Sequence, residues 1–250
     1  MKRIFGTPPR LNKKITIVSC LAILFALAFL FLFIRERYPQ RILDRFLPSR
    51  QSAGEFQPVH NERALDAWEN CLKQARLDAD VVFFGDSLTR RGGFDRYFPE
   101  KTVCNLGLGL DTIAGMTERV SMIAAVSPET VFVMGGINSL RDDTLDRSVK
   151  EYDALMSRIA DSCPASVYVV SVLPISKEKA SELGCSPDTI VRFNEAIEAY
   201  ATRCGFLYID LYRDFATDGG YMSGELTTDG VHLTEEGYTL WTAAISGLLN

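Results

Sequence analysis

Histidine is scarce in this sequence, and its cysteines lack the spacing of a metal site. The 250 residues include only two histidines, His60 and His232, so a nucleophile that needs an imidazole base has two candidates. Five of the six cysteines follow residue 34, and none has the paired spacing of a zinc site. Cys163 and Cys204 either pair with each other or remain buried free thiols. We therefore expect no metal and no cofactor.

Positive charge is also scarce in the body of the chain. Residues 51–250 contain 17 Lys and Arg against 30 Asp and Glu, whereas residues 1–50 contain 10 against 2. An acidic body is unfavourable for binding a polyanion. The sequence therefore excludes nucleic acid as the expected partner.

A long uncharged run lies near the N-terminus. Residues 15–34 form 20 consecutive uncharged, mostly apolar positions, about the length with which a helix crosses roughly 30 Å of hydrocarbon. The run predicts a single transmembrane helix and hence a membrane localisation. A cleavable signal peptide is the alternative, but it requires a shorter apolar core and a small-x-small cleavage site.

The membrane prediction sets the domain organisation. We expect a basic leader at 1–14, the span at 15–34, a juxtamembrane linker at 35–58 and one folded domain at 59–250. Equal numbers of basic residues flank the span, so the positive-inside rule does not decide its orientation. The short basic leader favours a cytoplasmic N-terminus and an extracytoplasmic domain.

Short apolar runs alternate with helical patterns after residue 59. The runs are almost continuously apolar, as in strands that are covered on both faces. The expected strands are 80–84, 102–105, 130–134, 166–172 and 206–210. The expected helices are 112–126, 144–161, 188–203 and one beginning at Thr234, a plausible N-cap. This alternation predicts a doubly wound parallel sheet.

Two turns carry residues typical of nucleophilic catalysis. The run 81–85 delivers Ser87 at its carboxyl end, where open α/β sheets bind ligands. Asp229 precedes His232 by three positions, so its carboxylate can bind one ring nitrogen and leave the other for a serine. His60 has no such carboxylate and is interpreted as a surface residue.

A third turn supplies an amide donor. The run 130–134 leads through Gly135 and Gly136 to Asn138. A negatively charged oxygen that develops during a reaction needs fixed N–H donors of this kind.

Four sequence blocks together resemble the GDSL/SGNH hydrolases. They are Gly-Asp-Ser-Leu at 85–88, Asn-Leu-Gly-Leu-Gly-Leu-Asp-Thr at 105–112, Gly-Ile-Asn at 136–138 and Asp-Gly-Val-His-Leu at 229–233. The resemblance covers about residues 79–249. It implies a flavodoxin-like three-layer α/β/α sandwich with a five-stranded parallel sheet, and cleavage or transfer of acyl esters through an acyl-serine. No Gly-x-Ser-x-Gly elbow of the α/β-hydrolases occurs.

The same resemblance implies roles for individual residues. Ser87 would attack, His232 would act as base and then acid, and Asp229 would orient it. The oxyanion hole would consist of the Ser87 N–H, a backbone N–H at Gly109 or Leu110, and the Asn138 side chain. Many relatives have Gly where this chain has Leu110, and Asp where it has Ser139.

The last block resembles the acetylhydrolase-like and carbohydrate-esterase branch of the family. We therefore expect a membrane-anchored esterase that removes short acyl groups, often acetyl, from an acylated small molecule or a cell-envelope glycan. The alternatives are an O-acyltransferase with the same triad, a lysophospholipase or thioesterase, and a catalytically silent glycan-binding module. The polar stretch 175–188 is a candidate lid or substrate wall. Arg90 and Arg91 either meet an acidic glycan or phosphate, or form a solvated surface.

Overall fold

The computed structural model of the chain describes residues 78–249. The predicted leader, span and linker, the start of the predicted domain and His60 lie outside these residues. Among residues 78–249, no helix has the length and apolar character needed to cross a membrane.

The centre of the structure is a parallel sheet. Its strands are β1 (Val81–Gly85), β2 (Val103–Gly107), β3 (Thr130–Met134), β4 (Ser166–Val170) and β5 (Leu207–Ile209). Their order in the sheet is β2-β1-β3-β4-β5, and every pairing is parallel. This is the strand order of flavodoxin-like doubly wound sheets. The predicted five-stranded parallel sheet is therefore confirmed.

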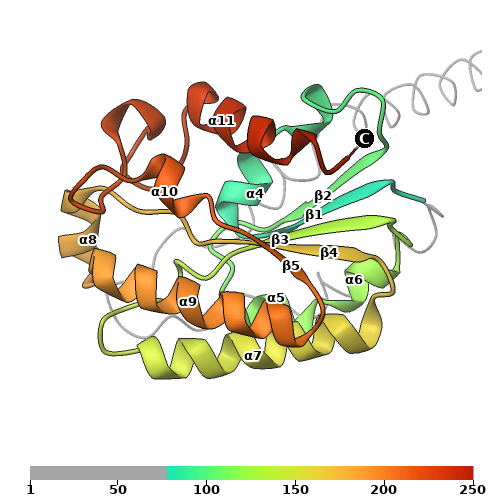
Figure 1. Ribbon diagram of the computed structural model, residues 1–250, viewed down its shortest axis with the longest axis horizontal. Coiled ribbons are helices and arrows are strands. Elements are labelled where there is room, and N and C mark those ends of the chain that lie inside the picture. Colours follow the sequence, from blue (N-terminus) through green and yellow to red (C-terminus); the bar gives the residue numbers. More distant parts are fainter. Residues whose placement is uncertain (1–77, 250) are drawn as a thin grey trace, which may run out of the picture. The chain divides into compact units, whose positions relative to one another are not determined.

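Helices cover both faces of the sheet (Figure 1). One face carries α5 (Ile113–Glu118), α6 (Ser121–Ala124), α7 (Leu145–Ser162) and α9 (Pro187–Arg203). The other carries α4 (Ser87–Arg91), η1 (Phe94–Arg96) and α11 (Glu235–Ser246). The connections contain α8 (Lys177–Leu183), α10 (Tyr212–Phe215) and η2 (Gly224–Leu226).

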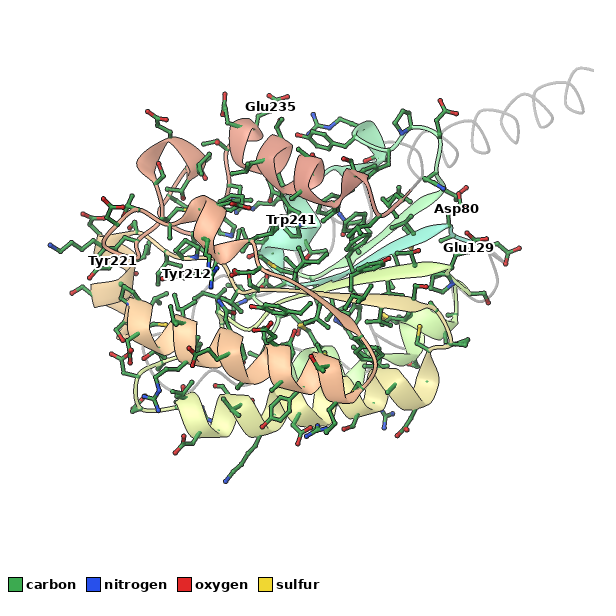
Figure 2. The ribbon with its side chains drawn as sticks, viewed as in Figure 1. Asp80, Glu129, Tyr212, Tyr221, Glu235 and Trp241 are labelled. Atoms are coloured by element: carbon green, nitrogen blue, oxygen red, sulfur yellow. The ribbon has the colours of Figure 1, made fainter. Side chains whose placement is uncertain are left out.

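Alternating strand residues build a separate core on each side of the sheet, because successive side chains of a strand point to opposite faces. Phe84 packs in the core that includes Tyr152 of α7, whereas Phe83 packs in the core that includes Trp241 of α11. Figure 2 shows Trp241 directed from α11 toward the sheet and Glu235 on the outer side of the same helix. Each large apolar side chain buried in this way contributes about 1.5–3 kcal/mol.

The helix expected at 112–126 is wrong as a single element. The structure has α5 and α6 there, with Arg119 as the C-cap of α5 (φ −109°, ψ 17°). Arg119 turns its side chain into the interior, where it is 1% exposed. By contrast, the predicted N-cap of the last helix is confirmed, since the Thr234 hydroxyl accepts a hydrogen bond from the Gly237 N–H.

The cysteines of the described residues are free thiols. Cys163 and Cys185 are buried, whereas Cys104 and Cys204 are half-buried. Of the two alternatives for Cys163 and Cys204, the disulfide is therefore wrong and the free thiols are confirmed.

Candidate active site

Ser87 is the first residue of α4, directly after the end of β1. The Asp86 carboxylate caps this helix, because its Oδ1 accepts a hydrogen bond from the Leu88 N–H at 2.9 Å. The helix lies close against the end of β2, since a Cβ added at Gly107 would lie only 2.2 Å from the Arg90 backbone nitrogen. The cap and this close approach fix the position of the Ser87 side chain.

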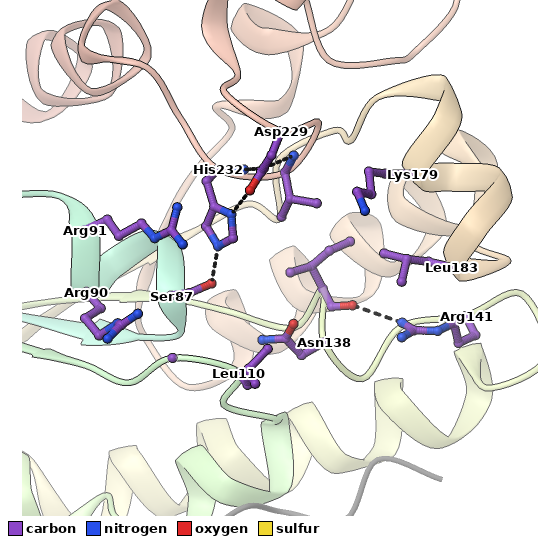
Figure 3. A pocket seen from close by; sticks show the side chains of 13 residues that line it. Ser87, Arg90, Arg91, Leu110, Asn138, Arg141, Lys179, Leu183, Asp229 and His232 are labelled. Carbon is purple, nitrogen blue, oxygen red and sulfur yellow. Dashed lines mark hydrogen bonds and ion pairs between the residues drawn. The ribbon is translucent and has the colours of Figure 1, made fainter. Parts of the chain in front are cut away.

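The turn before α11 brings Asp229 and His232 to this serine (Figure 3). The His232 Nε2 lies 3.0 Å from the Ser87 Oγ. The His232 Nδ1 lies 2.7 Å from the Asp229 Oδ2. The other oxygen, Asp229 Oδ1, accepts hydrogen bonds from the N–H groups of His232 at 2.8 Å and Val231 at 3.1 Å. The structure thus assembles the three side chains in the order serine, imidazole, carboxylate.

The hydrogen bonds of Asp229 keep it ionised. Partial burial acts to raise its pKa, but the hydrogen bonds from the His232 N–H, the His232 ring and the Val231 N–H outweigh this effect and lower the pKa to about 2. An ionised Asp229 accepts a hydrogen bond from the Nδ1–H of His232. In this tautomer of the neutral ring, the Nε2 lone pair faces the Ser87 hydroxyl. This is the tautomer in which an imidazole can take a proton from serine.

Helix α8 supports the turn from the outside. Gly230 has a φ of +90°, and a Cβ added to it would lie 2.5 Å from the Ser176 Oγ. The Ser176 N–H donates a hydrogen bond to the Gly230 carbonyl at 2.8 Å. Lys179 and Leu183 of the same helix line the pocket at Ser87. The stretch 175–188 therefore forms a wall of the pocket.

The residues expected in the oxyanion hole line the same pocket. Ser87, Gly109, Leu110 and Asn138 all contribute to its lining. One N–H of the Asn138 amide donates to the Asp111 carbonyl at 2.8 Å. This bond fixes the amide group, which carries a second N–H. Asn138 is thus a positioned donor beneath the serine (Figure 3).

Ser139 has a structural role in place of the Asp that many relatives carry. Its hydroxyl accepts a hydrogen bond from the Ile113 N–H at 3.0 Å, at the start of α5. The loop after β3 is thereby tied to the loop that carries Gly109 and Leu110.

Leu110 occupies a backbone conformation that favours glycine. Its φ is +62°, and its side chain is 57% exposed at the pocket. A left-handed conformation costs an L-residue about 1–2 kcal/mol. The leucine therefore keeps the backbone geometry that a glycine adopts without strain.

Leu110→Gly is expected to change the free energy of unfolding by less than about 1 kcal/mol, because relief of strain offsets the greater freedom of glycine in the unfolded chain. Leu110→Val is expected to lose about 1 kcal/mol or more, since a β-branched residue tolerates positive φ poorly. Urea unfolding of the two variants checks the difference. A valine variant as stable as the parent would contradict this view of the loop.

Sequence reasoning missed a buried ion pair behind the site. The Arg119 Nε lies 2.6 Å from the Asp111 Oδ2, and both side chains are fully buried. The Arg119 guanidinium also donates to the carbonyls of Leu106 and Gly85, each at 2.7 Å. One side chain thus ties the ends of β1 and β2 to the residue that holds Asn138. The sequence offered one indication of this burial: Arg119 follows Met116 by three positions and so falls on the apolar side of the predicted helix.

Asp86 is a second buried charge that the sequence left as a simple cap. Its burial, together with the nearby Asp111, raises its pKa to about 7, although the Leu88 hydrogen bond and Arg119 act in the opposite direction. The folded state therefore binds a proton more tightly at Asp86 than the unfolded chain does, and stability falls as the pH rises from about 4 through about 7.

Asp86→Asn is expected to raise the free energy of unfolding at about pH 8 by up to about 4 kcal/mol, because the amide keeps an acceptor for Leu88 and cannot ionise. The gain should shrink toward about pH 4. Urea unfolding across this range checks it, with the exposed Asp218→Asn as the matched control. Parallel pH curves for Asp86→Asn and the parent would contradict the prediction.

The pocket has a volume of about 260 Å³ and is open to solvent. Its apolar lining comes from Leu110, Ile137, Leu183 and Val231. Within residues 78–249, no group of three or more His, Cys, Asp or Glu side chains is arranged to hold a metal ion. Ser87, His232 and Asp229 also line this pocket.

Solved structures with the same fold include several esterases and lipases. A GDSL-like lipase from Bacteroides thetaiotaomicron is 23% identical, with a TM-score of 0.63 over 76% of this chain and 97% of that one. A lipase/acylhydrolase from Enterococcus faecalis is 19% identical, with a TM-score of 0.56 over 68% and 94%. An acetyl xylan esterase is 19% identical, with a TM-score of 0.57 over 68% and 99%. No curated protein matches the chain.

A family model matches residues 83–240, which include Ser87, Asn138, Asp229 and His232. The family is described as GDSL-like lipase/acylhydrolase. This match confirms the family that the four sequence blocks predict, and it is consistent with the shared fold of the solved structures. The chain therefore belongs to the GDSL-like lipase/acylhydrolase family and is a hydrolase that acts on esters.

Proposed function

We propose that this protein is a serine esterase that removes short acyl groups from hydroxyl oxygens through an acyl-Ser87 intermediate. The observation that carries the proposal is the position of His232, whose two ring nitrogens lie 3.0 Å from the Ser87 Oγ and 2.7 Å from Asp229. A binding module has no need of this aligned pair of hydrogen bonds.

The geometry supports a two-step reaction. The Ser87 oxygen attacks the ester carbonyl while its proton moves to His232 Nε2, and Asp229 stabilises the resulting imidazolium. The negative oxygen of the tetrahedral intermediate would accept hydrogen bonds from N–H groups of Ser87, the Gly109–Leu110 segment and the Asn138 side chain. The intermediate then expels the alcohol, which takes the proton from His232. Water, activated by the same base, releases the acyl group as a carboxylic acid.

The pocket supports a small acyl group. Its apolar lining comes from four side chains, and its volume of about 260 Å³ lies just below the lower end of the roughly 300–1,000 Å³ of drug-sized sites. An acetyl xylan esterase shares the fold. We therefore extend the proposal to O-acetyl esters, with an acylated glycan as the substrate class.

Ester hydrolysis and active-site labelling test the proposal. The purified full-length chain in detergent should hydrolyse nitrophenyl esters, with activity falling from acetyl to octanoyl, and a fluorophosphonate should label Ser87. Ser87→Ala should remove both signals. The proposal is abandoned if the chain cleaves none of the esters and Ser87 is not labelled. Product analysis with an acceptor sugar distinguishes transfer of the acyl group from its hydrolysis.

The proposal includes a membrane tether. It is based on the 20 uncharged residues at 15–34, which are long enough for a span. The full chain should fractionate with membranes. If the catalytic domain is extracytoplasmic, protease added from outside should digest it in cells whose outer layers have been removed and whose cytoplasmic membrane remains sealed. Recovery of the full chain in the soluble fraction would contradict the tether without affecting the esterase proposal.

A further inference from the structure

The pocket at Ser87 has a charge opposite to that of the surrounding domain. Four basic side chains line it: Arg90, Arg91, Arg141 and Lys179. Among the described residues of its lining, Asp229 alone is acidic, and its carboxylate is bound to His232. Residues 51–250 as a whole contain 17 basic and 30 acidic residues. The positive charge is therefore concentrated at the site and is not a general property of the surface.

The basic side chains lie on both sides of the triad. In Figure 3, Arg90 and Arg91 of α4 lie on one side of Ser87, whereas Arg141 and Lys179 lie on the other. They come from three separate segments of the chain: α4, the loop after β3, and α8. Their convergence is thus a product of the fold and not of one basic stretch of sequence.

Contacts with the backbone hold two of the guanidinium groups in place. The Arg141 Nη1 donates to the carbonyls of Leu140 at 2.5 Å and Ile137 at 3.3 Å. The Arg90 guanidinium lies against Gly109, because a Cβ added there would be 3.2 Å from the Arg90 Cζ. Gly109, one of the two expected backbone donors, thus has no side chain, and the Arg90 guanidinium occupies that space.

Like charges gathered in a concave site raise its positive potential, because the low-dielectric walls focus the field and attract anions. Lys179 is the member with an acidic partner on its own helix, Glu182, at 2.6 Å from Nζ to Oε2. The four basic side chains of the lining outnumber the carboxylates of Asp229 and Glu182. The arrangement is stabilised when a ligand brings negative charge into the pocket.

We propose that this pocket selects esters that carry an anionic group, such as a carboxylate, sulfate or phosphate, close to the acyl bond. The inference rests on the proposed esterase function and specifies its substrate class. An acylated acidic sugar fits the proposal, whereas an acylated neutral glycan does not use the basic side chains. The anion would bind in the pocket at Ser87, within reach of lining side chains such as Arg91 or Lys179.

A matched pair of probes tests the charge preference. Para-nitrophenyl hemisuccinate and its methyl ester differ in the negative charge of the acyl group, and release of nitrophenolate reports cleavage of the same bond in both. O-acetylated glucuronate and glucose differ in the charge of the alcohol part. We expect the full-length chain to show a kcat/KM at least about tenfold higher for the anionic member of one pair at about 10 mM salt. The preference should largely disappear at about 1 M salt, because screening then acts within a few ångströms.

Variants connect the preference to the pocket. Arg91→Gln and Lys179→Gln should each lower the anionic-to-neutral ratio of kcat/KM several-fold. Lys150→Gln removes one exposed positive charge from α7, outside the pocket, and should leave the ratio unchanged. A ratio of one or less for both probe pairs at low salt overturns the proposal, as does a ratio that none of the pocket variants changes.

A binding measurement separates this proposal from the esterase proposal. Calorimetric titration of the full-length chain with glucuronate and glucose reports the charge preference even if no ester is cleaved. Tighter binding of glucuronate, weakened in Lys179→Gln, supports the anionic pocket. Equal binding of the two sugars, or none of either, combined with cleavage of neutral esters, overturns the anionic pocket and leaves the esterase proposal intact.

Discussion

His232→Ala is expected to lower kcat for ester hydrolysis by about 10⁶-fold, and Ser87→Ala by a similar factor. The two side chains act as one unit, because the hydroxyl attacks only when the Nε2 at 3.0 Å takes its proton. The double variant should therefore lose no more activity than either single variant. Single-turnover and steady-state kinetics with para-nitrophenyl acetate check this non-additivity.

The second histidine of the chain is the matched control. His60→Ala should keep the parent kcat, because His60 lacks the carboxylate three positions earlier that His232 has in Asp229. Far-ultraviolet circular dichroism should show all variants folded. Multiplicative losses in the double variant, or a comparable loss in His60→Ala, would show that the base is not His232 acting on Ser87.

Arg119→Met is expected to lower the free energy of unfolding by about 3–5 kcal/mol, because it leaves the Asp111 carboxylate buried without its partner. It also removes the hydrogen bonds that the Arg119 guanidinium donates to the carbonyls of Gly85, at the end of β1, and Leu106, near the end of β2. Urea unfolding measures the loss. Since Asp111 holds Asn138, kcat should fall as well in variant protein that remains folded.

Two comparison variants test the cause of this loss. Arg119→Met combined with Asp111→Asn should recover part of the stability. The double variant no longer buries the Asp111 charge, but the carbonyls of Leu106 and Gly85 still lack the Arg119 donor. Arg147→Met on α7 removes an exposed arginine whose Nε lies 3.9 Å from Glu151, and it should cost about 0–1 kcal/mol. Equal losses at Arg119 and Arg147 would be inconsistent with a structural role for the buried pair.

The sheet could be predicted from the sequence because each strand is a short apolar run between polar turns. Burial on both faces leaves only the first residue of β3, Thr130, polar, and its other four residues are apolar and buried. The break between α5 and α6 could not be predicted in the same way. The pattern of 112–126 is helical, but Arg119 ends α5 where its side chain reaches carbonyls on β1 and β2, and these contacts are absent from local sequence.

Part of the candidate site could likewise be predicted from the sequence, because two of its residues lie close together in the chain. Asp229 and His232 are three residues apart, so one turn suffices to join them, and the sequence contains that information. The contact between His232 and Ser87 spans 145 positions and depends on where the sheet places the end of β1. The positive φ of Leu110 is likewise a property of the folded loop.

The sequence by itself determined the alternation of strands and helices, the four blocks of the family, and the scarcity of histidine that left one suitable base. Only the tertiary structure decided that α8 forms a wall beside the triad and that Arg119 lies inside the fold. It also decided that Arg90, Arg91, Arg141 and Lys179 converge on one pocket. The reason is physical: periodicity and short spacings act within a few turns of the chain, whereas these contacts join segments that meet only when the sheet is assembled.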